Sequence, residues 1–197
     1  MWYNTCVKGK LTMCNCKKVL VLILAVAVKC AFAFPDSSVS DASGHIKVDS
    51  LKGYTLERKY TFDDFQVDGT NYYRQYTKKL SPRETLYVYA LEDGRVYAIE
   101  YWLYLSNKLS ASEKLSFVQQ VVAELQKSCI LKLKFSKEKT TDGEPLSLWE
   151  CEDWDRRLFV WFVHNENSSR PRNRNGVMRI NLSSKKLLRQ ERDKATQ

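Results

Sequence analysis

The stretch that decides the fold is residues 85–135, which read TLYVYALEDGRVYAIEYWLYLSNKLSASEKLSFVQQVVAELQKSCILKLKF. Two runs rich in Tyr, Val, Ile and Leu, residues 86–91 and 96–105, flank the dipeptide Asp93-Gly94. Because Asp-Gly tolerates a positive φ at both positions, this pattern predicts a β-hairpin closed by a two-residue type I′ turn.

That turn would pair Glu92 with Arg95 and Leu91 with Val96, and the pairing sorts the side chains of the hairpin onto two faces. The face expected to meet the core carries Leu86, Val88, Ala90, Ile99 and Leu103. The other face carries Tyr87, Tyr89, Glu100, Trp102 and Tyr104. Its four aromatic residues are a candidate binding face, because Tyr and Trp are frequent in binding hot spots. The alternative is that another part of the chain covers them as a second core.

A helix is expected directly after the hairpin, over about residues 111–128. Ser110 and Glu113 have the spacing of a capping box, in which each side chain accepts from the other residue's backbone N–H. Apolar residues follow at the spacing of one helical face. They are Leu115, Val118, Val122 and Leu125.

Alternating or continuous apolar runs predict further strands at residues 54–62, 72–77, 130–135, 146–151, 158–164 and 177–182. The run 158–164 is apolar at both parities, which indicates a central strand covered on both faces. Ser183 is placed to cap a terminal helix. The sequence therefore predicts an α+β fold: an antiparallel sheet of about seven strands, arranged as a meander, with one principal helix on one face.

The N-terminal residues have the pattern of a cleavable signal peptide. Lys17 and Lys18 precede ten apolar residues, 19–28, and the small-x-small pattern Ala31-Phe32-Ala33 follows. We expect cleavage after Ala33 and an extracytoplasmic (secreted or periplasmic) protein, with Met13 as an alternative start. Residues 34–52 read as a flexible tether and residues 53–197 as a single domain with a basic C-terminal tail. The alternative is an uncleaved leader that tethers the domain to a membrane.

The cysteines support export. Four of the six lie in the leader, which leaves Cys129 and Cys151. A hairpin centred near Thr140 would pair residue i with 280 − i and set these two opposite each other. In an oxidising compartment this predicts a disulfide bond, the alternative being two reduced, buried thiols.

The positive charge is concentrated near the C-terminus. The chain has a net charge of +9, but five lysines and no acidic residue lie in the leader, and residues 156–197 hold 11 basic and 3 acidic residues. The candidate anion-binding residues are Arg170, Arg172, Arg174, Lys185 and Arg189. Outside the cytoplasm such a patch would meet a protein or an anionic envelope polymer. A chain kept in the cytoplasm would make nucleic acid a candidate ligand.

No catalytic, metal or cofactor motif occurs in the sequence. The only histidines are His45 and His164, and the latter is expected at the rim of a strand. The acidic residues Glu150, Glu152, Asp153 and Asp155 lack the spacing of a calcium loop. The sequence predicts an exported, non-enzymatic binding or assembly domain, without a cofactor. The alternative is a small hydrolase acting on an extracytoplasmic glycan through carboxylates among Asp63, Asp64, Glu100 and Glu150.

Overall fold

The computed structural model describes residues 46–68, 73–141, 143–164 and 176–195. Eight strands form one antiparallel sheet: β3 (Gln66–Asp68), β4 (Tyr73–Ser81), β5 (Glu84–Leu91), β6 (Val96–Tyr104), β7 (Lys134–Lys139), β8 (Pro145–Glu152), β9 (Arg156–Val163) and β10 (Val177–Ser184). A small second sheet is formed by β1 (Ser50–Leu51) and β2 (Tyr54–Thr55). The helices in these ranges are α2 (Ala111–Gln126) and α3 (Lys185–Ala195). Neither of them is long and apolar enough to span a membrane. The predicted leader lies outside the described residues.

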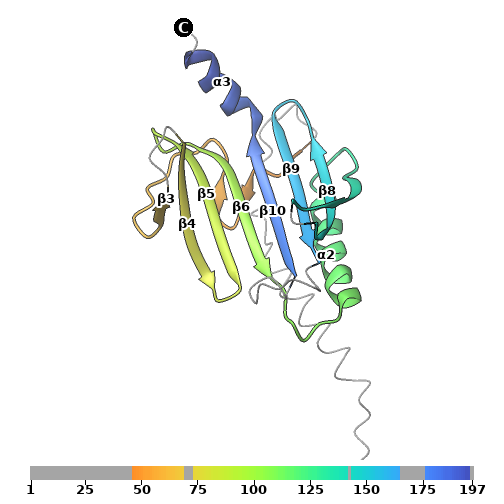
Figure 1. The fold of residues 1–197 in the computed structure, drawn as a ribbon. Helices are drawn as coiled ribbons and strands as arrows, with labels where there is room; N and C mark the ends of the chain where they lie inside the picture. The colour runs from red at the N-terminus through yellow and green to blue at the C-terminus, as the bar shows by residue number, and fades with distance from the viewer. Residues whose placement is uncertain (1–45, 69–72, 142, 165–175, 196–197) are drawn as a thin grey trace, which may run out of the picture. The chain divides into compact units, whose positions relative to one another are not determined.

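The strand order of the large sheet is β3-β4-β5-β6-β10-β9-β8-β7. The sheet thus consists of two four-stranded meanders, joined where β6 pairs with β10 (Figure 1). The helix α2 connects β6, in the middle of the sheet, to β7 at one edge. The chain therefore passes over one face of the sheet on its way from the first meander to the second. This arrangement confirms the α+β fold with one main helix, and the sheet has one strand more than expected.

The β5–β6 hairpin forms, but its turn is not of type I′. Gly94 has a φ of +83°, whereas Asp93 does not have a positive φ. The amide of Leu91 donates to the Arg95 carbonyl and the amide of Gly94 to the Leu91 carbonyl, which makes a three-residue loop. Val96 therefore pairs with Ala90, and the predicted pairings at the tip are wrong by one residue.

A bulge near Tyr97 restores the predicted register over the rest of the hairpin. Tyr89 pairs with Ala98, Val88 with Ile99, and so on to Glu84 with Leu103. The faces of the hairpin are consequently those predicted. Leu86, Val88, Ala90 and Ile99 are fully buried, and Tyr101, on the same face, is also buried. Leu103 is only half-buried.

The segment before β3 is a packed covering layer and not the long strand predicted over 54–62. Only Tyr54–Thr55 is a strand, because the backbone then leaves the extended region at Glu57, which has a φ of +66°. Phe62 stacks on Tyr76 of β4 with the ring centres 3.9 Å apart. Of the predicted tether, residues 46–52 are described, and Ile46 and Val48 in it are buried.

The helix α2 begins as predicted. Ser110 is its N-cap, and both hydrogen bonds of the capping box with Glu113 are formed. The buried face is rotated slightly from the expected one: Leu115 is half exposed, while Phe117 and Val121 are buried with Val118, Val122 and Leu125. The helix packs against β9, and so covers the β9 side of the core.

The β7–β8 hairpin is formed in a different register from the predicted one. Lys134 pairs with Glu150 and Lys139 with Pro145, so that residue i pairs with 284 − i. The turn is set by Gly143, whose φ of +81° lets its amide donate to the Thr140 carbonyl. The turn is therefore centred beyond Thr140, and β7 begins at Lys134 instead of Ile130.

The predicted disulfide is not formed. Because of the changed register, Cys129 lies before β7, bridged to Ile46, and Cys151 lies within β8. Both are buried free thiols. Burial, and in second place the neighbouring Cys151 thiol, raise the pKa of the Cys129 thiol to about 12.

Candidate functional site

The face of the sheet opposite the core carries the residues predicted as a binding face. Tyr87, Tyr89, Trp102 and Tyr104 all lie on it and all are half-buried. The ring centres of Tyr87 and Trp102 are 5.0 Å apart and those of Trp102 and Tyr104 6.5 Å apart. The helix α2 and the small sheet both pack on the other face, against β9 and β6. Neither α2 nor the small sheet therefore covers these aromatic side chains.

The second meander extends this surface. Trp161 of β9 and Trp102 of β6 both pair with Arg179 of β10, which lies between them. Phe159 stacks on Trp161 with ring centres 5.0 Å apart. The prediction that residues 158–164 are covered on both faces is wrong, because Phe159, Trp161 and Val163 are half exposed. We call the surface formed by Tyr87, Tyr89, Trp102, Tyr104, Phe159 and Trp161 the aromatic face.

Arg179 gives the aromatic face a positive charge. Its guanidinium carbon lies 3.7 Å from the centre of the Trp102 ring, the geometry of a cation–π contact. No carboxylate among the described residues forms an ion pair with Arg179. Its Nε and the Trp102 Nε1 are buried donors without a hydrogen-bond partner in the described part of the chain. A buried donor without a partner carries a desolvation cost, so this contact is not optimised for stability alone.

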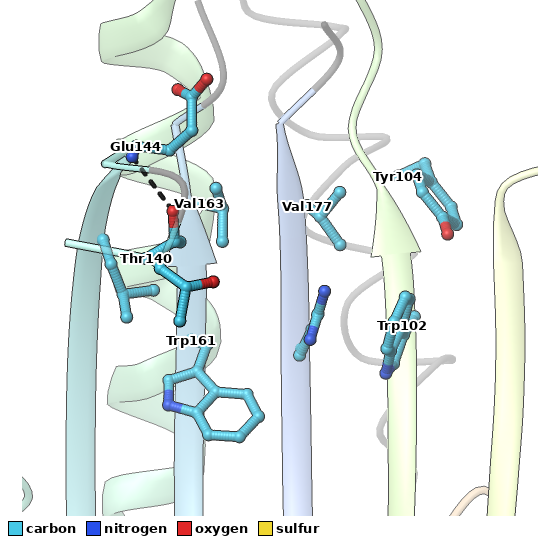
Figure 2. A pocket seen from close by; sticks show the side chains of 10 residues that line it. Trp102, Tyr104, Thr140, Glu144, Trp161, Val163 and Val177 are labelled. Carbon is cyan, nitrogen blue, oxygen red and sulfur yellow. Dashed lines mark hydrogen bonds between the residues drawn. The ribbon is translucent and has the colours of Figure 1, made fainter. Parts of the chain in front are cut away.

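A pocket of about 340 Å³ lies at the end of the aromatic face where β6 ends and β10 begins. Figure 2 shows Trp102 and Tyr104 of β6, Val177 of β10 and Trp161 and Val163 of β9, with Thr140 and Glu144 at the β7–β8 turn. Thr141, Leu146 and Arg179 complete the lining. The turn is held by the Glu144 amide, which donates to Thr140 Oγ1 over 3.0 Å. The volume and the mixture of aromatic walls with a few polar groups are those of a small-ligand site.

A buried carboxylate lies farther along the same face. Glu100 is 7% exposed and accepts a hydrogen bond of 3.2 Å from the hydroxyl of Tyr89. Burial and the nearby Glu100 charge raise the pKa of Tyr89 above its ordinary range, so this phenol stays protonated and serves as a donor. The pair fixes the orientation of Tyr89 on the face.

Glu100 and Glu150, two of the carboxylates named for the alternative hydrolase, lie apart on the sheet. Glu100 pairs with Asn181, Asn181 with Phe159 and Phe159 with Glu150, so two strands separate the two glutamates. Three strand spacings amount to roughly 14 Å, more than the separation of either type of glycosidase pair. Glu150 is also paired with Arg157. Asp64 bonds to Lys78, whose side chain belongs to the core face.

The predicted anion-binding residues in the described part of the chain are already paired. Lys185 contacts Glu152 over 2.5 Å, and this hydrogen bond lowers the pKa of the Glu152 carboxyl. Arg189 donates to the Trp154 carbonyl over 2.6 Å and lies 3.4 Å from Asp155. Arg170, Arg172 and Arg174 lie outside the described residues, as does His45.

The acidic residues 150–155 act as structural partners. Asp153 accepts from the amides of Ile46, Asp155 and Arg156. Within the described ranges, no three side chains that could ligate a metal gather together. His164, half-buried at the end of β9, lies 3.0 Å from the hydroxyl of Ser147. Because Ser147 is buried, that hydroxyl is closed to a substrate.

Sequence patterns missed Arg179, Trp161 and Glu144. Each belongs to a strand or turn whose position beside β6 depends on long-range pairing. The alternation of Phe159 and Trp161 with buried Leu158 and Val160 was a usable signal for a strand with one open face.

Comparison with known proteins gives no match: no family model fits the chain, and no curated protein or solved structure is significantly similar to it.

Proposed function

We propose that the chain is a non-enzymatic binding domain that acts outside the cytoplasm and holds an anionic envelope polymer on its aromatic face. The observation that supports it most is the position of Arg179. This cation lies on Trp102 at the wall of a pocket, without a carboxylate partner among the described residues.

The aromatic side chains supply the contact area for such a ligand. Tyr87, Trp102 and the pair Phe159 and Trp161 lie on strands β5, β6 and β9, and Arg179 of β10 lies between the two tryptophans, so the rings form two apolar areas on either side of one cation. Aromatic rings on a rigid sheet offer large contacts at a small cost in side-chain entropy. A chain of sugar rings is the polymer whose alternating flat apolar faces and polar edges fit this surface.

The cation Arg179 favours an anionic polymer over a neutral one. A guanidinium held against an indole has already lost part of its hydration, so it gains more from an incoming anion than a solvated lysine does. The alternative ligand is a partner protein with an acidic, aromatic patch. Titration with a polysaccharide distinguishes the two ligands.

Export follows from the leader pattern of residues 1–33 and belongs to the same proposal. N-terminal sequencing of the protein purified from its own host checks it. A chain that starts at Phe34 in an extracytoplasmic fraction supports export. An intact leader in the membrane fraction means that the domain is tethered, and an intact leader in the cytoplasm contradicts the location and makes nucleic acid the ligand to test.

The binding function is tested by calorimetric titration of the protein with polygalacturonate, with neutral dextran as the control polymer. We expect binding to polygalacturonate only. Trp161→Ala should weaken this binding by about tenfold, because the stacking of a flat ring on an aromatic side chain contributes on the order of 1–3 kcal/mol. Trp154→Ala is the matched control, since Trp154 is 77% exposed and lies outside the aromatic face. Absence of binding, or equal losses in both variants, overturns the proposal and leaves a protein partner as the reading to pursue.

A further inference from the structure

The pocket beside Arg179 is more specific than the rest of the aromatic face, because its charges are arranged asymmetrically. Arg179 lies on the sheet, between Trp102 and Trp161. Glu144 lies on the β7–β8 turn, in the lining of the same pocket. A ligand in this pocket therefore lies against one cation, whereas the Glu144 carboxylate, which points away from Trp102 and Trp161 in Figure 2, lies at the rim.

The Arg179 side can recognise a carboxylate. A guanidinium presents a planar fork of N–H donors that matches the two oxygens of a carboxylate. The stacking on Trp102 at 3.7 Å restricts the guanidinium plane, so little further side-chain entropy is lost when an acid binds.

The Glu144 carboxylate at the rim disfavours a ligand that carries negative charge on every side. The Glu144 carboxylate has no hydrogen-bond or ion-pair partner among the described residues. An ionised carboxylate accepts hydrogen bonds from hydroxyl groups and repels a second anion. The hydroxyls of Thr140, Thr141 and Tyr104 line the same pocket and can donate or accept. This half of the pocket is suited to a neutral, hydroxyl-rich group.

The remaining lining is apolar. Trp102, Trp161, Leu146, Val163 and Val177 offer flat or aliphatic contacts to a ring. A volume of about 340 Å³ lies at the lower end of the range for small-ligand sites, which suits one ring with its substituents better than a long segment.

From this arrangement we infer that the pocket is a subsite for a single uronic acid residue, with the carboxylate on Arg179, the hydroxyls toward the threonines at the rim, and the ring against the indoles. The inference rests on the proposed function, since the uronic acid would be one unit of the bound polymer.

The test uses the monosaccharides themselves. Sodium D-galacturonate, D-galactose, acetate and sulfate are each titrated into the full chain, with indole fluorescence as the readout. We expect galacturonate to bind about tenfold or more tightly than galactose, since one charge-assisted bidentate contact is worth on the order of 1.5–3 kcal/mol. Acetate and sulfate, which lack the ring and its hydroxyls, should bind more weakly than galacturonate.

Two substitutions separate the roles of the charges. Arg179→Lys keeps the charge but removes the fork, and should weaken galacturonate binding by about tenfold. Glu144→Gln removes the repulsion between the carboxylate and a bound anion, and should reduce the difference in affinity between galacturonate and sulfate. The melting temperature of each variant shows whether it is folded.

The outcomes separate the two proposals. If polygalacturonate binds but galacturonate binds no better than galactose, or if sulfate binds as well as galacturonate, the uronate subsite is wrong while the polymer function stands. If galacturonate binds through Arg179 and polygalacturonate does not, the subsite stands and the polymer function fails.

Discussion

Arg179 and Trp102 face each other directly across the junction of β10 and β6, with the guanidinium 3.7 Å from the indole centre. The residues are 77 positions apart, and they meet only because the two meanders join at these two strands. The junction thereby places a cation from one half of the sheet on an aromatic ring from the other. The proposed binding site is built on this contact.

The exposure of the aromatic face predicts that its residues contribute less to stability than their size suggests. Trp102→Ala should cost about 1–2 kcal/mol of unfolding free energy, because only part of the side chain is withdrawn from water. Tyr101→Ala, on the buried face of the same strand, should cost about 3–5 kcal/mol. Urea unfolding of both variants measures the difference. Equal losses would mean that Trp102 is part of a covered core.

Much of the local structure could be predicted from the sequence because its signals are local. The Ser110–Glu113 capping box and the alternation around Asp93-Gly94 each involve residues a few positions apart, and both the helix and the hairpin are found in the structure. The turn type was mispredicted, because Asp-Gly also fits a type I turn followed by a left-handed glycine.

Only about half of the residues of the candidate site could be predicted from the sequence. Trp102 and Tyr104 were identified from the hairpin pattern, but Trp161 and Arg179 reach them through β10, whose neighbours are distant in sequence. The β7–β8 register was also missed, since it depends on which residue of the connecting turn adopts a positive φ. Both failures concern pairing between strands, which is decided by the packing of the whole sheet.

The β5–β6 turn gives a test of backbone strain with an internal control. Gly94 has a φ of +83° and a Cβ there would lie 3.0 Å from the Tyr60 carbonyl oxygen, whereas at Gly53, with a φ of +86°, a Cβ would meet nothing within 4 Å. Gly53→Ala should therefore cost only the left-handed strain of about 1–2 kcal/mol. Gly94→Ala should cost distinctly more in the same urea experiment. A smaller loss at Gly94 than at Gly53 would show that the Tyr60 segment yields without cost.

The helix cap is a second local test. Ser110→Ala should lower the unfolding free energy by about 1 kcal/mol, because the Glu113 amide loses its acceptor. Ser116→Ala, at an exposed position within α2, is the control and should have no cost, since alanine is the better helix former. Thermal melts of the two variants suffice, and a loss at Ser116 as large as at Ser110 would argue against the cap.

The buried thiols predict a dependence on alkaline pH. The folded state raises the pKa of Cys129 from 9.0 to about 12, chiefly through burial. The unfolded chain therefore loses this proton first, and the associated stability is complete below pH 9 and lost as the pH rises toward 12. Cys129→Ala should make the decline between these values shallower. An unchanged pH profile would show that the thiol titrates normally.

The same burial predicts low thiol reactivity. Only a thiolate is alkylated rapidly, and Cys129 and Cys151 are both buried with raised pKa values. We expect iodoacetamide at pH 8 to label neither residue in the folded protein and both in urea. Mass analysis without reductant should show two free thiols. A linked Cys129–Cys151 pair would contradict the unbonded arrangement described above.

The most direct test of the proposed binding site is the affinity of Arg179→Met for polygalacturonate, compared with that of Arg58→Met. Both variants lose one positive charge, but Arg58 is exposed near Val96, at the end of β6 away from the pocket. We expect a loss of about tenfold or more in Arg179→Met and almost none in Arg58→Met. Equal affinities in the two variants would show that the contact of Arg179 with Trp102 is not the binding site.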